Sequence, residues 1–92
     1  MNKYPNTTLF VRKHLEPLAI EHEMQYNTRN PAHLLWMLIQ IEKEDMDEAK
    51  AGRWIGWIAA VMTHVYNTLP LSEIQIRDII RQDVEEYNAK SH

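Results

Sequence analysis

Five histidines are the residues of this chain best suited to metal binding or acid–base chemistry. His22 and the glutamate after it begin as the helix of a zinc protease does, but Tyr26 stands where that motif has its second histidine. His14 and His22 share a helix face only if the helix continues through Pro17. A metal-dependent hydrolase would need these two histidines clustered with carboxylates, and their spacing does not predict it. We therefore expect no metal and no other cofactor.

Nucleophiles and carboxylates give no stronger signal for catalysis. Ser72 is explained as a helix cap and Ser91 lies in the C-terminal tail. Glu85 and Glu86 are adjacent, so on a helix they point in different directions. The acidic run 42–48 lacks the glycine and the ligand spacing of an EF-hand, and we interpret it as a solvated connection. The sequence predicts a protein that is not an enzyme.

Arginines and a tryptophan form the best candidate for a binding surface. Arg53 and Trp57 are four positions apart, so the guanidinium can lie over the indole. Arginine and tryptophan are also enriched at the energetic centres of protein interfaces. The predicted partner-binding residues are Arg53, Trp57, Arg77, Asp78 and Arg81. The same residues would also fit an internal brace between helices, and that alternative remains open.

A long helix over Asp45–Asn67 organises the predicted elements. Its apolar arc, at about 100° per residue, contains Ala51, Trp54, Ile55, Ile58, Val61, Met62 and Val65. A strip of small residues lies beside this arc, although each glycine inside a helix costs about 1 kcal/mol relative to alanine. We therefore expect another helix to pack closely at Gly52, Gly56 and Ala60.

Two further helices flank the central one. Asn30 and Pro31 form a strong helix start, and the helix is predicted to run to about Glu44. Its main apolar stripe is Leu34, Met37, Leu38 and Ile41. Ser72 is predicted to cap the last helix, with Leu71 and Ile76 spaced as a hydrophobic staple. That helix should fray near Ala89, and its predicted buried stripe is Ile76, Ile79, Ile80, Val84 and Tyr87.

The N-terminal segment from Thr8 to Tyr26 is helical but contains Pro17. Proline removes a backbone hydrogen bond and disfavours helical geometry at the preceding residue. We expect either a kink or a break with a second helix that starts at Pro17. In a kinked helix the inward-facing residues would be Val11, His14, Leu15 and Leu18.

Asp83 falls on the same face as the apolar stripe of the last helix. A carboxylate in that position should be paired or lie at the edge of the core. We expect it to turn outward or to meet a cation such as His64 or Arg53. A role in recognition is the alternative.

Length and composition limit the possible functions. The 92 residues fit one domain, 1–92, in which we expect residues 1–7 and 89–92 to be frayed. The chain has no cysteine, which is natural in a reducing compartment, and its longest apolar runs are too short to cross a membrane. A net charge of −3 argues against a general phosphate-binding surface.

Three segments together resemble a group of small uncharacterised helical proteins of tailed bacteriophages. The segments are Pro31–Met37, Glu48–Ile58 and Ile76–Arg81, and the most specific of them reads Lys-Ala-x-Arg-Trp-Ile-Gly-aromatic. The resemblance covers roughly residues 31–81, and Leu69-Pro70-Leu71 stands where the group has a glycine-containing turn. The resemblance implies a phage setting and no particular reaction.

These observations predict an all-α protein: a small bundle of three main helices plus an N-terminal helical arm kinked or broken at Pro17. We expect a non-enzymatic phage accessory protein that binds a host or phage protein in the host cytoplasm. Its surplus of apolar helix surface also predicts self-association, as a homodimer. The alternative is a small helical DNA-binding regulator that uses Arg53, Arg77 and Arg81, although nucleic acid and membrane are not the expected partners.

Overall fold

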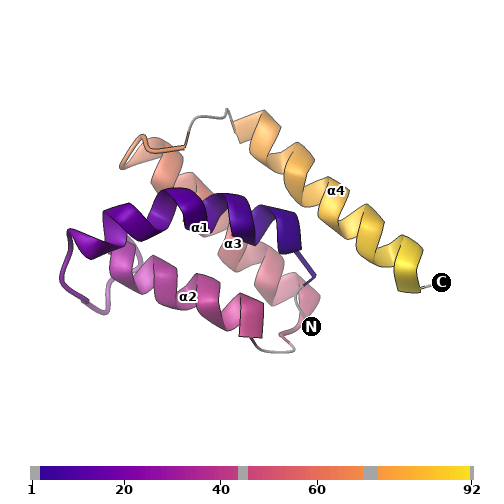
Figure 1. The fold of residues 1–92 in the computed structure, drawn as a ribbon, viewed down its shortest axis with the longest axis horizontal. Coiled ribbons are helices and arrows are strands. Elements are labelled where there is room, and N and C mark those ends of the chain that lie inside the picture. Colours follow the sequence, from indigo (N-terminus) through magenta and orange to yellow (C-terminus); the bar gives the residue numbers. More distant parts are fainter. Residues whose placement is uncertain (1–2, 44–45, 70–72, 92) are drawn as a thin grey trace.

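The computed structural model describes residues 3–43, 46–69 and 73–91, and within them it contains four α-helices and no strand. The helices are α1 (Pro5–Ile20), α2 (Pro31–Lys43), α3 (Glu48–His64) and α4 (Glu73–Ser91) (Figure 1). The prediction of an all-α fold is confirmed. None of these described helices combines the length and the apolar character that crossing a bilayer requires.

Helix α1 continues through Pro17, so no second helix starts there. The proline removes the amide donor that would bond the carbonyl of Lys13. Both Pro17 and Lys13 are exposed, so water can satisfy that carbonyl. The helix ends at Ile20 rather than at Tyr26, and it begins at Pro5 rather than at Thr8.

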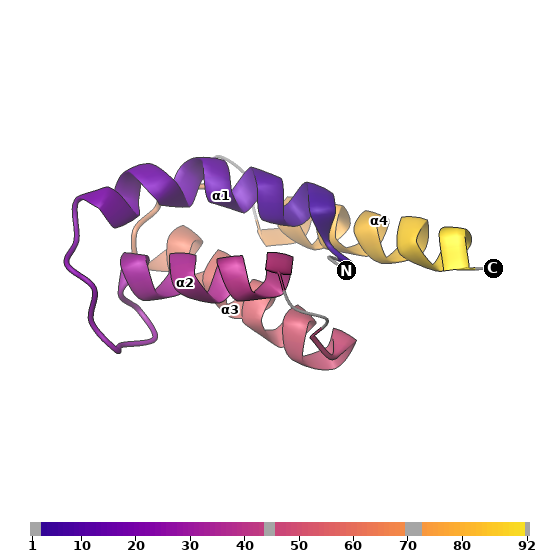
Figure 2. The same ribbon diagram turned by 60° about the horizontal axis from the view of Figure 1, so that its bottom comes forward.

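The N-terminal helix is a central element of the packing and not an arm. It packs most extensively against α2 and also contacts α3 and α4 (Figure 2). The residues that it buries are Thr7, Thr8, Val11, Leu15 and Ala19. Of the predicted inward residues, Val11 and Leu15 are buried, whereas His14 and Leu18 are half-buried. The helix starts early because its first turn is held by another helix, which the local sequence does not reveal.

Helix α2 begins where the sequence predicts. The backbone amide of His33 donates to Asn30 Oδ1 at 3.1 Å, so asparagine caps a helix whose first residue is Pro31. The predicted stripe is confirmed, because Leu34, Met37, Leu38 and Ile41 are all buried. Arg12 of α1 reaches both carboxylate oxygens of Glu42, at 2.9 and 3.1 Å, and joins the two helices at their edge.

Helix α3 is shorter at both ends than predicted. Asp47 caps it by accepting from the amide of Lys50 at 3.2 Å, so the helix begins at Glu48, and the expected start at Asp45 lies outside the described residues. After His64 the chain turns, and Asn67 adopts a φ of 51°, which asparagine tolerates better than most residues. The predicted apolar arc is buried except at Trp54, which is half-buried, and at Val65, which lies beyond the helix and is exposed.

Helix α4 is attached more loosely than its predicted stripe implies. Only Ile76 of that stripe is buried, and the other four members are half-buried: Ile79, Ile80, Val84 and Tyr87. The helix extends past the ends of the other three in both ribbon views (Figures 1 and 2). It remains helical to Ser91, where we expected fraying from Ala89. Its predicted cap, Ser72, and the staple residue Leu71 lie outside the described residues.

Candidate protein-interaction surfaces

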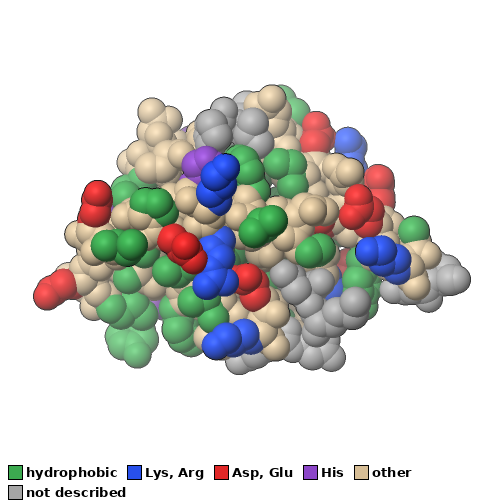
Figure 3. All heavy atoms as spheres, viewed as in Figure 1, with side chains coloured by type: hydrophobic (Ala, Val, Ile, Leu, Met, Phe, Trp, Pro, Cys, Tyr) green, Lys and Arg blue, Asp and Glu red, His purple; other side chains and the backbone are tan. Residues whose placement is uncertain are grey.

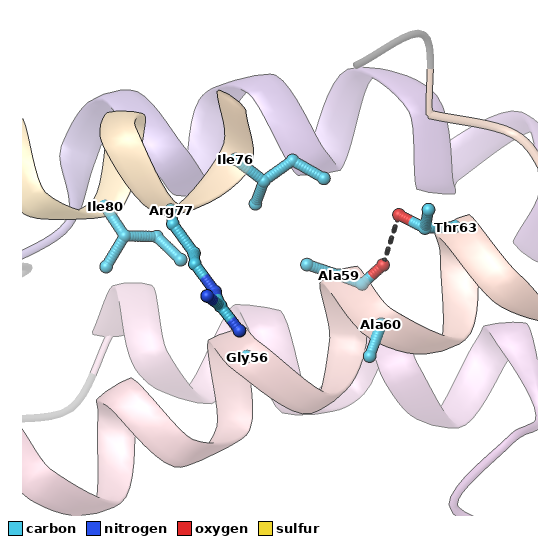
Figure 4. A pocket seen from close by; sticks show the side chains of 7 residues that line it. All are labelled: Gly56, Ala59, Ala60, Thr63, Ile76, Arg77 and Ile80. Carbon is cyan, nitrogen blue, oxygen red and sulfur yellow. Dashed lines mark hydrogen bonds between the residues drawn. The ribbon is translucent and has the colours of Figure 1, made fainter. Parts of the chain in front are cut away.

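An open groove separates α3 from α4. Its volume is about 190 Å³, several times the roughly 30 Å³ that one water occupies in the liquid, so it has room for apolar side chains. The residues that line it are Gly56, Ala59, Ala60, Thr63, Ile76, Arg77 and Ile80 (Figure 4). We call this feature the α3–α4 groove.

The floor of the groove is the small-residue strip of α3. Apart from the adjoining residues and the backbone of its own helix, no described atom lies within 4 Å of the position that a Cβ would take at Gly56. The hydroxyl of Thr63 donates to the carbonyl of Ala59 at 2.8 Å, so it adds no unmet donor to the groove (Figure 4). At Gly56 the strip therefore presents bare helix backbone to open space.

The expected close helix contact at the small residues is not made in the described chain. Gly56 faces open space, and Ala60 lines the groove beside it. At Gly52 a Cβ would lie 3.2 Å from the hydroxyl of Tyr4, so a side chain from the N-terminus approaches there instead of a helix. The surroundings of the two glycines differ: the Tyr4 hydroxyl lies near Gly52, and Gly56 has open space beside it.

The predicted arginine and tryptophan residues occupy two different surfaces. Arg77 lines the groove, and Figure 4 shows its side chain extending from α4 toward Gly56. Arg53 is exposed one turn before Gly56, and Arg81 is exposed one turn after Arg77. Arg81 pairs with Asp78 at 3.0 Å, an exposed i,i+3 pair that adds little stability.

Trp57 turns away from the groove toward the loop between α1 and α2. Its indole Nε1 donates to the carbonyl of Thr28 at 2.6 Å, and the hydroxyl of Tyr66 donates to the carbonyl of Arg29 at 2.6 Å. The two rings therefore hold this loop against α3. In the described chain the cation over an indole is Lys50, 5.0 Å from the ring centroid of Trp54, and Arg53 makes no such contact with Trp57.

A row of aromatic rings, which the sequence reasoning missed as a unit, runs from this loop across α2 to α3. The distances between ring centroids are 6.0 Å from Tyr26 to His33 and 5.6 Å from His33 to Trp36. The row ends with Trp54, whose ring centroid lies 6.3 Å from that of Trp36. We call Tyr26, His33, Trp36, Trp54 and Trp57 the aromatic face. The i,i+3 spacings of His33 with Trp36 and of Trp54 with Trp57 were the signal available in the sequence.

The aromatic face remains accessible in the folded chain. Tyr26 is 93% exposed, Trp36 45% and Trp57 40%. Hydrophobic side chains gather at the end of the molecule where α1 joins α2 (Figure 3). The two tryptophan-bearing helices are therefore not wholly enclosed within one protomer.

Asp83 is buried and caps α1 from α4. Its carboxylate, in a residue that is 1% exposed, accepts hydrogen bonds from the amide and hydroxyl of Thr7 at 2.8 and 2.6 Å. It also accepts from the side-chain amide and backbone amide of Asn6 at 2.8 and 3.3 Å. The expected partners, His64 and Arg53, are thus replaced by the first turn of a helix, whose free amides and dipole favour an anion. We call this contact the Asp83 latch.

His14 and His22 make local contacts with the backbone. His14 Nδ1 lies 3.0 Å from the carbonyl of Phe10, and His22 Nδ1 lies 2.8 Å from the carbonyl of Leu18. Each therefore bonds the backbone one turn earlier on its own segment. Within the described residues no three histidine, aspartate or glutamate side chains stand close enough together to hold a metal ion.

Comparisons with known proteins leave the chain without an assigned family. No protein-family model matches it, and neither the curated proteins nor the solved structures contain a match. The functional argument therefore depends on the two surfaces described above, the aromatic face and the α3–α4 groove.

Proposed function

We propose that this protein acts without catalysis by binding another protein through its aromatic face. The observation that carries the proposal is the exposure of Trp36 and Trp57 beside a fully exposed Tyr26. Tryptophan and tyrosine supply large apolar contact area together with a polar group, and they are the side chains most enriched at binding hot spots. The partner is a protein of a phage or its host, or a second copy of this chain, in the host cytoplasm.

Several contacts restrain the aromatic face. Trp57 and Tyr66 each donate a 2.6 Å hydrogen bond to the loop that carries Tyr26. The ring contacts from Tyr26 to Trp54 restrain the remaining side chains. A surface that is already ordered loses less conformational entropy when a partner binds, which favours affinity.

Capture from lysates of infected and uninfected host cells tests this function. Trp36→Ala should lose the captured protein, because Trp36 is half-exposed at the centre of the aromatic face. Ile20→Ala is the matched control, since Ile20 is 85% exposed on α1 and outside the aromatic face. Equal capture by Trp36→Ala and the wild type would contradict the proposed surface, and a wild-type chain that captures nothing and is also a monomer would contradict the proposed function.

Light scattering on the same samples separates the two kinds of partner. If a second copy occupies the aromatic face, the wild type should have twice the monomer mass and Trp36→Ala should be a monomer. If another protein occupies it, both should be monomers on their own. Circular dichroism of each variant checks that Trp36→Ala, which also loses ring contacts to His33 and Trp54, retains its helices.

A further inference from the structure

The polar groups of the aromatic face constrain the chemistry of its partner. Three of its five members are tryptophans, and an indole N–H donates a hydrogen bond but cannot accept one. Trp57 already donates to the carbonyl of Thr28, whereas the indoles of Trp36 and Trp54 have no acceptor among the described residues. A donor that loses its water when a partner binds needs a new acceptor. The α3–α4 groove, lined mainly by small and apolar side chains, gives no comparable information.

The loop beside the rings offers few acceptors in return. The carbonyl of Thr28 already accepts from Trp57 at 2.6 Å. The carbonyl of Arg29 already accepts from Tyr66 at the same distance. Nδ1 of His33 is buried and has no partner in the described chain, so it is not presented to a partner either. A partner that brought many backbone N–H groups to this surface would therefore leave donors unmet.

Among regular backbones, a polyproline II segment meets both conditions. It makes no internal hydrogen bonds, so its carbonyls are free to accept, and each proline removes one backbone N–H. A helix uses most of its carbonyls in its own hydrogen bonds, so it would have to supply acceptors from side chains. A β-strand exposes N–H groups that bond to the edge of a sheet, and the described chain contains no strand.

The spacing of the rings also suits this backbone. Proline-rich segments bind to surfaces that are lined with aromatic side chains. From Tyr26 to Trp54, successive ring centroids are 5.6 to 6.3 Å apart. Two residues of polyproline II advance by about 6.2 Å, at about 3.1 Å per residue. Prolines two positions apart can therefore lie on neighbouring rings.

We propose that the aromatic face binds a proline-rich segment of a partner protein in the polyproline II conformation. Prolines pack on the rings of Tyr26 and Trp36, and a backbone carbonyl of the segment accepts from Nε1 of Trp36. The inference rests on the proposed function, because it names the chemistry of the protein that this face binds.

A displayed library of short random peptides tests the proposal. Selection against the full chain should enrich prolines two or three positions apart. The selected peptide should bind Trp36→Ala at least about tenfold more weakly, measured by fluorescence anisotropy of a labelled peptide. Trp36→Phe keeps an aromatic ring without the N–H donor, so it should weaken binding by about three- to tenfold. Ile20→Ala, exposed outside the aromatic face, should change binding less than about twofold.

Decaproline is a second probe, because it is already in the polyproline II conformation. It should bind the wild type and displace the selected peptide, whereas a glycine–serine peptide of equal length should do neither. Circular dichroism checks that each variant is folded, and Trp36→Phe keeps the test decisive if Trp36→Ala is not. Selection of peptides without proline, recovery of no binder, no binding of decaproline, or unchanged binding to both Trp36 variants would each overturn the proposal.

The lysate capture described above separates failure of this inference from failure of the proposed function. If capture depends on Trp36 but proline-rich peptides do not bind, the face binds a protein of another kind and only the inference is overturned. A wild-type dimer that decaproline does not dissociate also overturns only the inference, because a second copy is then the occupant. A monomeric wild type that captures nothing overturns both.

Discussion

The two sides of α4 are held by different physics. On its α1 side the Asp83 latch buries a carboxylate that accepts four hydrogen bonds from Asn6 and Thr7, at 2.6 to 3.3 Å. On its α3 side lies the α3–α4 groove, to which α4 contributes Ile76, Arg77 and Ile80, and of these Ile76 is buried. The α1 side of α4 is therefore a closed contact made by directional hydrogen bonds. The α3 side is an apolar surface that is partly open.

This difference explains how a groove can persist in so small a protein. Apolar contact is not directional, so two helices joined only by it would slide until they covered their exposed surface. Hydrogen bonds to a buried carboxylate are directional. They weaken when α4 moves so that donor and acceptor leave the preferred distance and angle. The latch restrains where α4 lies relative to α1, and with α4 in that position the space above Gly56 is open.

Removing the Asp83 latch should lower the stability of the fold more than any other single change considered below. Asp83→Ala leaves the buried amide and hydroxyl of Thr7 without an acceptor, and we expect a loss of about 3 kcal/mol in the free energy of unfolding. Urea denaturation measures this loss. The control is Glu85→Ala, an exposed carboxylate on the same helix, which should change stability by less than about 0.5 kcal/mol. Equal effects of the two substitutions would mean that α4 is not held by the latch.

Loss of the apolar contact that attaches α4 to the core should have the second largest effect on stability. Ile76→Ala removes the buried side chain that joins α4 to the core, and such truncations cost about 2–3 kcal/mol where the surroundings can partly collapse. The open groove beside Ile76 allows that collapse, so the cost should lie near the lower figure. Ile74→Ala is the control, because Ile74 is 70% exposed on the same helix. A loss at Ile74 as large as that at Ile76 would show that α4 packs through a different face.

The two glycines of α3 should respond differently to the same change. Gly56→Ala adds a methyl group to open space and should raise the free energy of unfolding by about 1 kcal/mol, the usual difference between these residues inside a helix. Gly52→Ala should gain less or lose stability, because its methyl group would lie 3.2 Å from the Tyr4 hydroxyl. Thermal unfolding of both variants checks the order. Equal gains would show that Tyr4 moves aside freely.

Capping residues and apolar periodicity were enough to predict the start of α2 and the buried faces of α2 and α3. The Asn30 cap with Pro31 and the stripe from Leu34 to Ile41 were confirmed, because capping and periodicity are properties of neighbouring residues. The buried arc of α3 was confirmed through Met62, except at the half-buried Trp54, for the same reason.

Contacts between distant segments were not predictable from those patterns. The start of α1 at Pro5 depends on Asp83, which lies 76 positions after Thr7 in the chain. The small residues of α3 suggested a close helix, but the space beside Gly56 is open, and that depends on where the whole of α4 lies. The aromatic face was missed because Tyr26 and Trp54 come from a loop and a helix that only the fold brings together.

Ionisation of Tyr4 should have the smallest effect on stability. It tests the contact between the N-terminal segment and Gly52 of α3. Burial, and then the nearby carboxylates of Glu48 and Asp83, raise the pKa of the Tyr4 hydroxyl above its ordinary value of 10.0. A raised pKa in the folded state means that its contribution to stability is complete below about pH 10 and is lost as the pH rises through the folded value. The wild type should therefore lose stability above about pH 10, and Tyr4→Phe should lose less because it cannot ionise. Urea denaturation at about pH 8 and about pH 11 measures the difference, with Tyr26→Phe as the control because Tyr26 is 93% exposed. Parallel losses of stability in Tyr4→Phe and the wild type over this range would contradict the arrangement. The Tyr4 hydroxyl would then not be held beside Gly52 and the two carboxylates, and the surface at Gly52 would be as open as the groove at Gly56.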